Sequence, residues 1–352
     1  MKPYRRVEGR TSLGRRYWYW SRNRNVLPPI PSHFLDAVVF LYGSQEDAQA
    51  GADSGGSGFI ASIGGDWRSR SLYIVTNRHV AEKARAVRVQ EPRGSRTEIV
   101  PTPEDGWRHH QDGDDVSVFP LGLDPEATFY YASISAGTSM HSVNEEQSWL
   151  GPGEDVFLLG RYIDRRGVQL DTPMARFGHI AAPPVKVRNP KRGIDQLSFL
   201  VEVLSRSGAS GSPAIAFRLQ LETPFMGGVR LSVGEPRDRH LQAQQGKPGS
   251  PVLLGINWGH LDEPLPVLVP GDEIYADEGP RESHERFYVE QNTGLAAVVP
   301  AWKITDLLWS DELKEMRDEE QAAKSEESKG SLRATEDAAQ APSEKPEESE
   351  RF

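Results

Sequence analysis

Residues 207–217 read SGASGSPAIAF, a run of glycine and serine between two apolar segments. Glycines on both sides of Ser210 let the backbone turn tightly, so that the serine hydroxyl projects from the chain. In such a turn nearby backbone N–H groups can converge on one point, which would form a candidate oxyanion hole. Because a glycine- and serine-rich stretch is also a common linker, this segment alone indicates only a candidate nucleophile.

A second candidate group, His79, ends a strongly apolar segment. Residues 72–81 read LYIVTNRHVA, which predicts a buried strand followed by a short helix that begins near the histidine. The preceding stretch 54–60, SGGSGFI, predicts a strand that can pair with it and hold the imidazole on a rigid edge. A histidine at the end of a strand is more often a packed structural residue, so His79 needs partners elsewhere in the chain.

An acidic pair stands directly before a third apolar segment, in residues 112–121, DGDDVSVFPL. Alternation along this strand favours Asp115 over Asp114 as the inward-facing carboxylate. Acids at the start of a strand are commonly solvated turn residues. The functional interpretation therefore rests on the joint occurrence of histidine, aspartate and serine in this order.

The chain between residues 31 and 300 predicts an all-β fold, because short apolar runs alternate there with Gly, Pro, Asp and Asn. A segment rich in Ser, Gly and Glu divides these runs into two groups at residues 132–152. We therefore expect four regions: a basic aromatic arm (1–30), a first β-barrel carrying His79 and Asp115 (31–135), a second β-barrel carrying Ser210 and a C-terminal helix (136–310), and a disordered acidic tail (311–352).

Composition adds two further expectations about these regions. From residue 321 the tail is rich in Glu, Ser, Ala, Lys and Pro and poor in aromatic residues, so it cannot bury enough apolar surface to fold and we expect disorder. Residues 227–250, rich in Arg, Gln, Gly and Pro, predict a long surface insertion between two strands.

Charge and cysteine content limit the possible environments. The chain has no cysteine, which excludes disulfides and a thiol nucleophile and fits a reducing, cytoplasmic location. No apolar run is long enough for a membrane-spanning helix, and the N-terminus lacks the features of a secretory signal. The net charge of −10 remains when the ends are set aside, because residues 1–25 carry +7 and residues 311–352 carry −7. Nucleic acid is therefore not the expected main partner.

The arm itself leaves several roles open. It interleaves arginine with Tyr17, Trp18, Tyr19 and Trp20. Such aromatic residues can pack on the domain, contact a protein partner, stack on nucleic-acid bases or lie at a membrane interface. Packing on the domain is the commonest of these, binding of a protein partner or nucleic acid is the next possibility, and membrane contact is the last.

Together these motifs resemble the trypsin-like (chymotrypsin-fold) serine peptidases, of the cysteine-free bacterial type. The resemblance covers residues 37–308: Gly-Ser-Gly-Phe at 56–59, Thr-x-x-His at 76–79, Asp before a strand at 115–118, and Gly-x-Ser-Gly-Ser-Pro at 208–213. The order His, Asp, Ser matches chymotrypsin and not subtilisin or the α/β-hydrolases. The resemblance implies two six-stranded β-barrels with an active site between them, containing His79, Asp115 and Ser210.

The activity that the resemblance implies is endopeptidase chemistry through an acyl-enzyme, with a protein or peptide substrate and no cofactor. The N–H groups of Gly208 and Ser210 would form the oxyanion hole. Ala209 replaces the acid that pairs with a new N-terminus in secreted trypsins, so activation by N-terminal cleavage is not expected. No metal is expected, because His109, His110 and Asp112 lie in one polar loop without a second ligand set.

The resemblance also indicates substrate-binding residues. Leu204, six residues before Ser210, corresponds to the floor of the primary pocket; we expect it to be buried and to favour modest apolar side chains. The strand at 254–259 resembles the edge that pairs with the substrate backbone, so Asn257, Trp258 and Gly259 are expected to line the pocket. An ordinary barrel strand is the alternative there.

Two other functions stay open from the sequence. One is a catalytically silent or regulated protease-fold module that binds peptides or scaffolds a bacterial complex. The other is a nucleic-acid-associated factor that acts through the basic arm, whose affinity would fall steeply with salt. A complete set of triad residues favours the enzyme over both.

Overall fold

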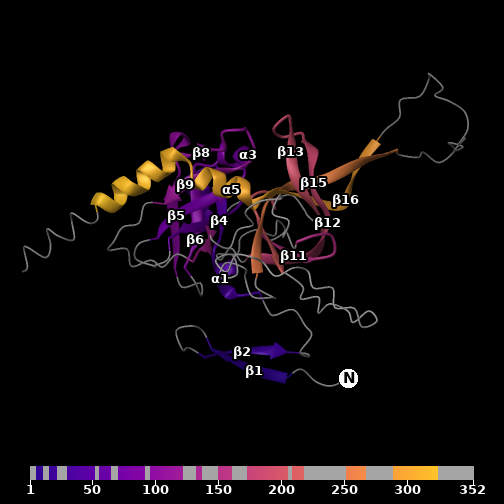
Figure 1. Ribbon diagram of the computed structural model, residues 1–352, viewed down its shortest axis with the longest axis horizontal. Coiled ribbons are helices and arrows are strands. Elements are labelled where there is room, and N and C mark those ends of the chain that lie inside the picture. The colour runs from indigo at the N-terminus through magenta and orange to yellow at the C-terminus, as the bar shows by residue number, and fades with distance from the viewer. Residues whose placement is uncertain are drawn as a thin grey trace, which may run out of the picture.

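The computed structural model describes most of the chain between residues 30 and 323. The described ranges are 30–51, 55–64, 70–91, 96–121, 132–136, 150–160, 173–204, 208–217, 251–266 and 288–323, together with the backbone of residues 5–10 and 16–21. Two β units lie side by side, with a C-terminal helix over their junction (Figure 1). The expected regions beyond these ranges, including the insertion at 227–250, lie outside the described residues.

The first β unit is an eight-stranded sheet with the order β7-β6-β3-β4-β5-β9-β8, to which β10 adds in parallel beside β4. All other neighbours are antiparallel. The unit has eight strands where a six-stranded barrel was expected. The strands are β3 (Val38–Tyr42), β4 (Gly56–Ile63), β5 (Ser71–Thr76), β6 (Ala86–Gln90), β7 (Thr97–Pro101), β8 (Arg108–His109), β9 (Ser117–Leu121) and β10 (Ile134–Ser135).

Strands of this unit are buried on both faces. Successive side chains of a strand point to opposite faces, and along β3 Val39 and Leu41 join one apolar cluster while Val38 and Phe40 join another. The first cluster is confined to the first unit, and the second continues into the second unit and the C-terminal helix. The sequence therefore shows continuous apolar runs in these strands, and the core joins the two units.

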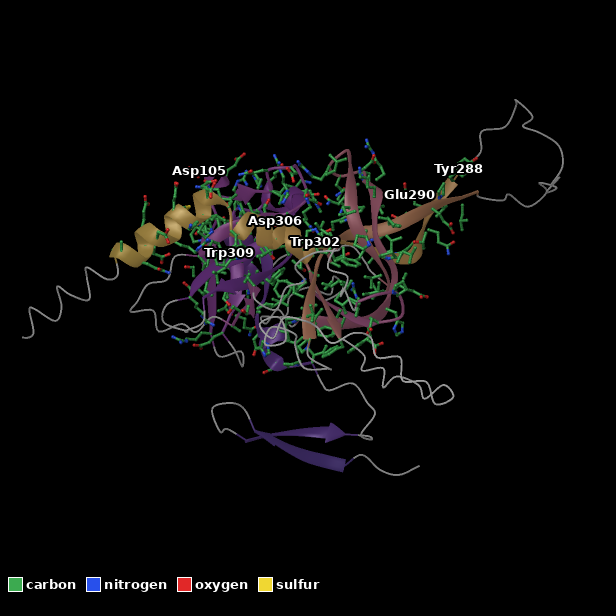
Figure 2. The ribbon with its side chains drawn as sticks, in the orientation of Figure 1. Asp105, Tyr288, Glu290, Trp302, Asp306 and Trp309 are labelled. Atoms are coloured by element: carbon green, nitrogen blue, oxygen red, sulfur yellow. The ribbon has the colours of Figure 1, made fainter. Side chains whose placement is uncertain are left out.

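The second β unit is a closed barrel of six antiparallel strands in the order β11-β12-β13-β16-β15-β14. Its strands β15 and β16 continue beyond the barrel as a two-stranded extension (Figure 1), on which Figure 2 labels Tyr288 and Glu290. The strands are β11 (Asp155–Gly160), β12 (Met174–Asn189), β13 (Ile194–Glu202), β14 (Pro213–Phe217), β15 (Pro251–Pro266) and β16 (Tyr288–Pro300). The predicted all-β fold of two units is confirmed.

Helices are short and lie at the ends of strands. The expected short helix after the β5 strand is α3, and the expected C-terminal helix is α5, which packs against β9 of the first unit and against β15 and β16 of the second. Trp302 and Trp309 mark its two ends in Figure 2. The helices are α1 (Ser32–Asp36), α2 (Gln45–Ala50), α3 (Arg78–Ala81), the 3-10 turn η1 (Glu104–Gly106) and α5 (Ala301–Leu308).

The start of the acidic tail requires a correction. Residues 311–323, which we assigned to the disordered tail, are helical. Leu313 is fully buried and Arg317 is 6% exposed, because the Arg317 guanidinium lies over the rings of Tyr73 and Trp309 and donates hydrogen bonds to Tyr73 Oη and the Leu308 carbonyl. These contacts hold the start of the tail as a helix, and its Glu, Lys, Leu and Ala residues have high helix propensity.

The basic aromatic arm forms its own two-stranded antiparallel sheet. Strand β1 (Arg5–Arg10) pairs with β2 (Arg16–Ser21), which carries the Tyr-Trp-Tyr-Trp run. Within the described residues this sheet has no strand of either β unit as a neighbour. A search of the described helices found none with the length and apolar character needed to span a bilayer.

Candidate active site

The imidazole of His79 is held by Asp115. His79 lies in α3 directly after β5, and Asp115 stands before β9, the neighbour of β5 in the sheet. Its ring Nδ1 is 2.7 Å from Asp115 Oδ2, and its backbone N–H donates to Oδ1 over 3.0 Å. Because an ionised carboxylate only accepts hydrogen bonds, Nδ1 carries the proton and Nε2 is left as an acceptor.

Asp115 is fully buried, and its other contacts come from both units. Its carboxylate Oδ2 accepts a hydrogen bond from Asn189 Nδ2, its backbone N–H donates to Gln196 Oε1, and its carbonyl accepts from Asn77 Nδ2. Burial acts to raise the pKa of Asp115, but the hydrogen bonds and charge of His79, with the bond from Asn189, outweigh it and lower that pKa. The carboxylate is therefore ionised at neutral pH.

The neighbouring acid, Asp114, faces a different set of partners. Its carboxylate lies 2.9 Å from the ammonium of Lys303 on α5 and 3.2 Å from His110 Nδ1, and it accepts from Gln196 Nε2. Asp112, His110 and Asp114 bring three possible metal ligands together. Lys303 lies within 3.6 Å of Asp112 as well and supplies positive charge at this cluster.

Ser210 lies in the turn that leads into β14 and is 9% exposed. The turn is fixed to the first unit, because Ser57 of β4 donates its N–H to the Ser210 carbonyl and its hydroxyl to the Gly208 carbonyl. The next residue, Gly211, has φ +90°, and a Cβ there would lie 1.7 Å from the Ser57 carbonyl oxygen. Only glycine fits at this position, which explains the residue after the candidate nucleophile.

The two backbone groups expected to bind an oxyanion are available. Within the described part of the chain, neither the Gly208 N–H nor the Ser210 N–H donates to another residue. Gly208 has φ +85°, a left-handed conformation that glycine adopts readily. The turn can therefore present two donors beside the serine hydroxyl.

The ammonium of Lys191 lies between the histidine and the serine. Lys191 belongs to the turn between β12 and β13, and its Nζ is 3.0 Å from Ser210 Oγ, 3.3 Å from His79 Nε2 and 3.4 Å from the Trp258 carbonyl oxygen. The Ser210 hydroxyl itself donates to the Trp258 carbonyl over 3.1 Å. Among the described contacts no hydrogen bond joins His79 directly to Ser210.

The predicted substrate-binding residues are only partly placed as expected. Leu204, two residues beyond the end of β13, is 61% exposed rather than buried. With Phe177 and Glu202 it lines an open pocket of about 430 Å³, whose lining does not include Ser210. The Trp258 indole is buried and donates to Ser198 Oγ inside the barrel. Asn257 donates from its side chain to the Ala209 carbonyl and so supports the serine turn.

Three residues of this site have no counterpart in the sequence interpretation: Asn189, Lys191 and Gln196. All belong to the β12–β13 hairpin, which reaches from the second unit to the acids of the first. The run Asn-Pro-Lys-Arg-Gly at 189–193 is a recognisable turn signal. Nothing in the sequence shows where such a turn docks, because its partners in the first unit are distant: Asp115 is 74 positions from Asn189, and His79 is 112 positions from Lys191.

Comparisons with known proteins identify related folds at low identity. No protein-family model matches the sequence, and no curated protein matches it. Among solved structures, the MamO protease domain from Magnetospirillum magneticum is 16% identical with a TM-score of 0.43, over 79% of this chain and 98% of that one. The inactive form of the Rv3671c protease is 14% identical with a TM-score of 0.38, over 78% and 88% of the chains.

A third solved structure, the HtrA-type protease AlgW with a decapeptide, is 15% identical with a TM-score of 0.36, and the match covers 72% of this chain and 52% of that one. At these identities the likeness concerns the fold alone. The chain's own topology is a closed six-stranded barrel beside an eight-stranded sheet, with Ser210 on the barrel unit and His79 on the sheet unit.

Proposed function

We propose that this protein is a serine endopeptidase in which Ser210 is the nucleophile, His79 the general base and Asp115 the carboxylate that orients the histidine. The observation that carries the proposal is the double hydrogen bond between His79 and a fully buried Asp115, beside a serine hydroxyl that shares a hydrogen-bonding partner with His79 Nε2. A buried carboxylate that fixes the histidine tautomer is what general-base catalysis requires.

The chemistry proposed is acyl transfer in two halves. Ser210 Oγ attacks the carbonyl carbon of a peptide bond while His79 Nε2 takes the hydroxyl proton, and Asp115 stabilises the resulting imidazolium. The tetrahedral intermediate collapses when Nε2 gives that proton to the leaving amine. Water then attacks the acyl-enzyme, His79 again accepts and returns a proton, and the carboxylic acid leaves.

The oxyanion of the tetrahedral intermediate needs hydrogen-bond donors that strengthen as charge develops. The free N–H groups of Gly208 and Ser210 are suited to this role, and each such donor contributes roughly 3 kcal/mol of transition-state stabilisation. Because Gly211 allows the turn to lie against β4, both donors are held by the scaffold and need little reorganisation.

A peptide substrate also needs a backbone to pair with. Strand β14 begins at Pro213, so β15 loses its β14 partner after the backbone bonds of Asn257 with Gly211 and Ser212. From Trp258 onward that edge of β15 faces the serine turn, as the contact of the Trp258 carbonyl with Ser210 shows. An extended peptide can add to this edge, which favours a peptide substrate over a small ester.

One observation favours a second candidate function, a silent or regulated protease-fold module. Lys191 contacts both Ser210 and His79, and the direct hydrogen bond between nucleophile and base is not formed. A module that only binds peptides could tolerate this arrangement permanently. The two candidates differ in whether the serine hydroxyl can react.

The test is reaction of the full-length chain with a fluorophosphonate, followed by cleavage of a peptide library. We expect covalent modification at Ser210, none in Ser210→Ala, and cleavage products that disappear in the same variant. A Ser62→Ala variant, which removes a serine hydroxyl on β4 of the first unit, is the control and should label like the wild type. A folded protein that is never modified at Ser210, even after long exposure, would exclude the endopeptidase.

A further inference from the structure

The β12–β13 turn brings a cation to the two atoms that must exchange a proton. A lysine ammonium has three N–H donors and no acceptor, and those of Lys191 face Ser210 Oγ, His79 Nε2 and the Trp258 carbonyl. The acceptor site of His79 is thereby filled. The serine proton is directed to Trp258, away from the imidazole.

The turn is held in this position by its own hydrogen bonds. The Asn189 carbonyl accepts from the N–H of Gly193, and the Asn189 side-chain oxygen accepts from the N–H groups of Lys191 and Arg192. Gly193 has φ +68°, which lets the chain reverse into β13. The side chain of Asn189 also binds Asp115, so the turn and the carboxylate are fixed to each other.

An ion pair ties the turn to the helix that carries the histidine. Arg192 Nη1 lies 2.9 Å from Glu82 Oε1, directly after α3, and the same carboxylate oxygen lies 3.1 Å from Arg78 Nε. Lys191 is thus flanked by two anchors, Asn189 and Arg192, that bind different elements of the first unit. The contact of Lys191 with the serine is a property of a docked turn.

We propose that the 189–193 turn is an autoinhibitory element, whose Lys191 ammonium keeps Ser210 and His79 apart until a peptide displaces it. This inference rests on the proposed endopeptidase function and specifies how that site is regulated. In the docked state Ser210 cannot pass its proton to His79 Nε2, because both atoms are bound to the same ammonium. The docked form is latent, and the fraction of undocked molecules sets the observed reactivity.

The Lys191 side chain lies where a bound peptide can displace it. Residue 191 as a whole is exposed, although its ammonium contacts Ser210, His79 and the Trp258 carbonyl. Burial lowers the pKa of Lys191 against the opposing charge of Asp115, and Lys83 lowers it further, which means that the docked ammonium is held at an electrostatic cost. A peptide that adds to β15 needs the same Trp258 carbonyl and therefore competes directly with Lys191.

The experiment compares rates of fluorophosphonate labelling in the full-length chain. The variants are Lys191→Ala, which removes the side chain, and Lys191→Met, which keeps a stem of similar length without charge or N–H donors. Lys186→Ala on the same hairpin is the matched control at an exposed lysine, and Ser210→Ala is the blank. Thermal melts verify that each variant is folded.

Both Lys191 variants are expected to label at least tenfold faster than the wild type, whereas Lys186→Ala should label at the wild-type rate. Equal rates in wild type and Lys191→Ala would overturn autoinhibition while leaving the proposed enzyme intact, and so would slower labelling of both variants. Fast labelling of Lys191→Ala with slow labelling of Lys191→Met would mean that the bulk of the side chain, and not its ammonium, blocks the serine. If no folded variant labels, the proposed endopeptidase function is itself wrong.

Discussion

Asn189 donates its side-chain N–H to Oδ2 of Asp115 across the boundary between the two β units, over 3.1 Å. The same oxygen accepts from His79 Nδ1, so one carboxylate atom links a residue of each unit. Both Asn189 and Asp115 are fully buried. The geometry of the candidate site therefore depends on how the β12–β13 hairpin docks, and not only on the unit that carries the histidine.

Replacing Asn189 with alanine should destabilise the fold. The buried carboxylate loses a donor, and the N–H groups of Lys191 and Arg192 lose their shared acceptor. We expect the free energy of unfolding to fall by about 2 kcal/mol, as for other buried polar groups left without a partner. Urea unfolding measures it. Arg188→Ala, an exposed neighbour on β12, should stay within about 0.5 kcal/mol, and equal losses in both variants would contradict this account.

The two adjacent acids should respond differently to the same substitution. Asp115→Asn removes the charge that orients His79 and is expected to slow Ser210 labelling roughly ten-thousandfold, by analogy with the serine-protease triad. Asp114→Asn should leave labelling close to the wild-type rate but lower thermal stability, because Lys303 and His110 lose a carboxylate. Both substitutions are made in chains that also carry Lys191→Ala, so that contact of Lys191 with Ser210 does not affect the labelling rates. A larger loss of labelling rate in Asp114→Asn than in Asp115→Asn would mean that Asp114 is the carboxylate that orients His79.

Glycine at position 211 should be irreplaceable, and Gly113 gives a matched comparison. Both have positive φ, but a Cβ on Gly113 meets open space, whereas one on Gly211 meets the Ser57 carbonyl and Thr76 Oγ1. We expect Gly113→Ala to lower the free energy of unfolding by about 1–2 kcal/mol, because of backbone strain alone. Gly211→Ala should lower the free energy of unfolding by clearly more than Gly113→Ala does, and it should also abolish labelling of Ser210. Denaturation curves for the two variants measure the difference, and similar losses would show that the turn can relax away from β4.

The three proposed triad residues could be predicted because each has a local signature. An apolar strand before His79, an acid before an alternating strand and glycines around Ser210 are all visible within about ten residues. The structure adds the contact between His79 and Asp115 that the separate signatures leave open. Alternation along β9 also distinguished Asp115 from Asp114 correctly as the partner of the histidine.

The residues that surround the triad could not be predicted, for a physical reason. Asn189, Lys191 and Gln196 act through contacts between units, and the sequence of a hairpin specifies its turn but not its docking. Leu204 was placed wrongly because its burial was inferred by counting back from Ser210, and a count along the chain does not determine whether a side chain is buried. The helix at 311–323 was missed although Leu313 and Arg317, four residues apart, share one helical face.

Stability should fall as the solution is acidified below neutrality, in part through His110. Its ring is 6% exposed, and burial lowers its pKa below 6.5 despite the opposing charges of Asp114, Asp112 and Asp306, while Lys303 lowers it further. The unfolded chain therefore binds a proton at a pH where the folded chain does not. This contribution is present above about pH 6.5 and is lost as the pH falls through that value toward the folded pKa.

Urea unfolding at about pH 7.5 and about pH 5.5 measures this effect. His110→Gln removes the titrating ring, so its free energy of unfolding should change less between the two conditions than that of the wild type. His179→Gln, at an exposed position on β12, is the control variant. Because Asp115 has a lowered pKa, its own contribution is lost only at more acidic pH and does not enter this window. An unchanged pH dependence in His110→Gln would mean that the ring binds protons equally in the folded and unfolded protein, which would contradict this account. A larger loss of stability on acidification in His110→Gln than in the wild type would mean that the folded protein holds the ring protonated, paired with Asp114.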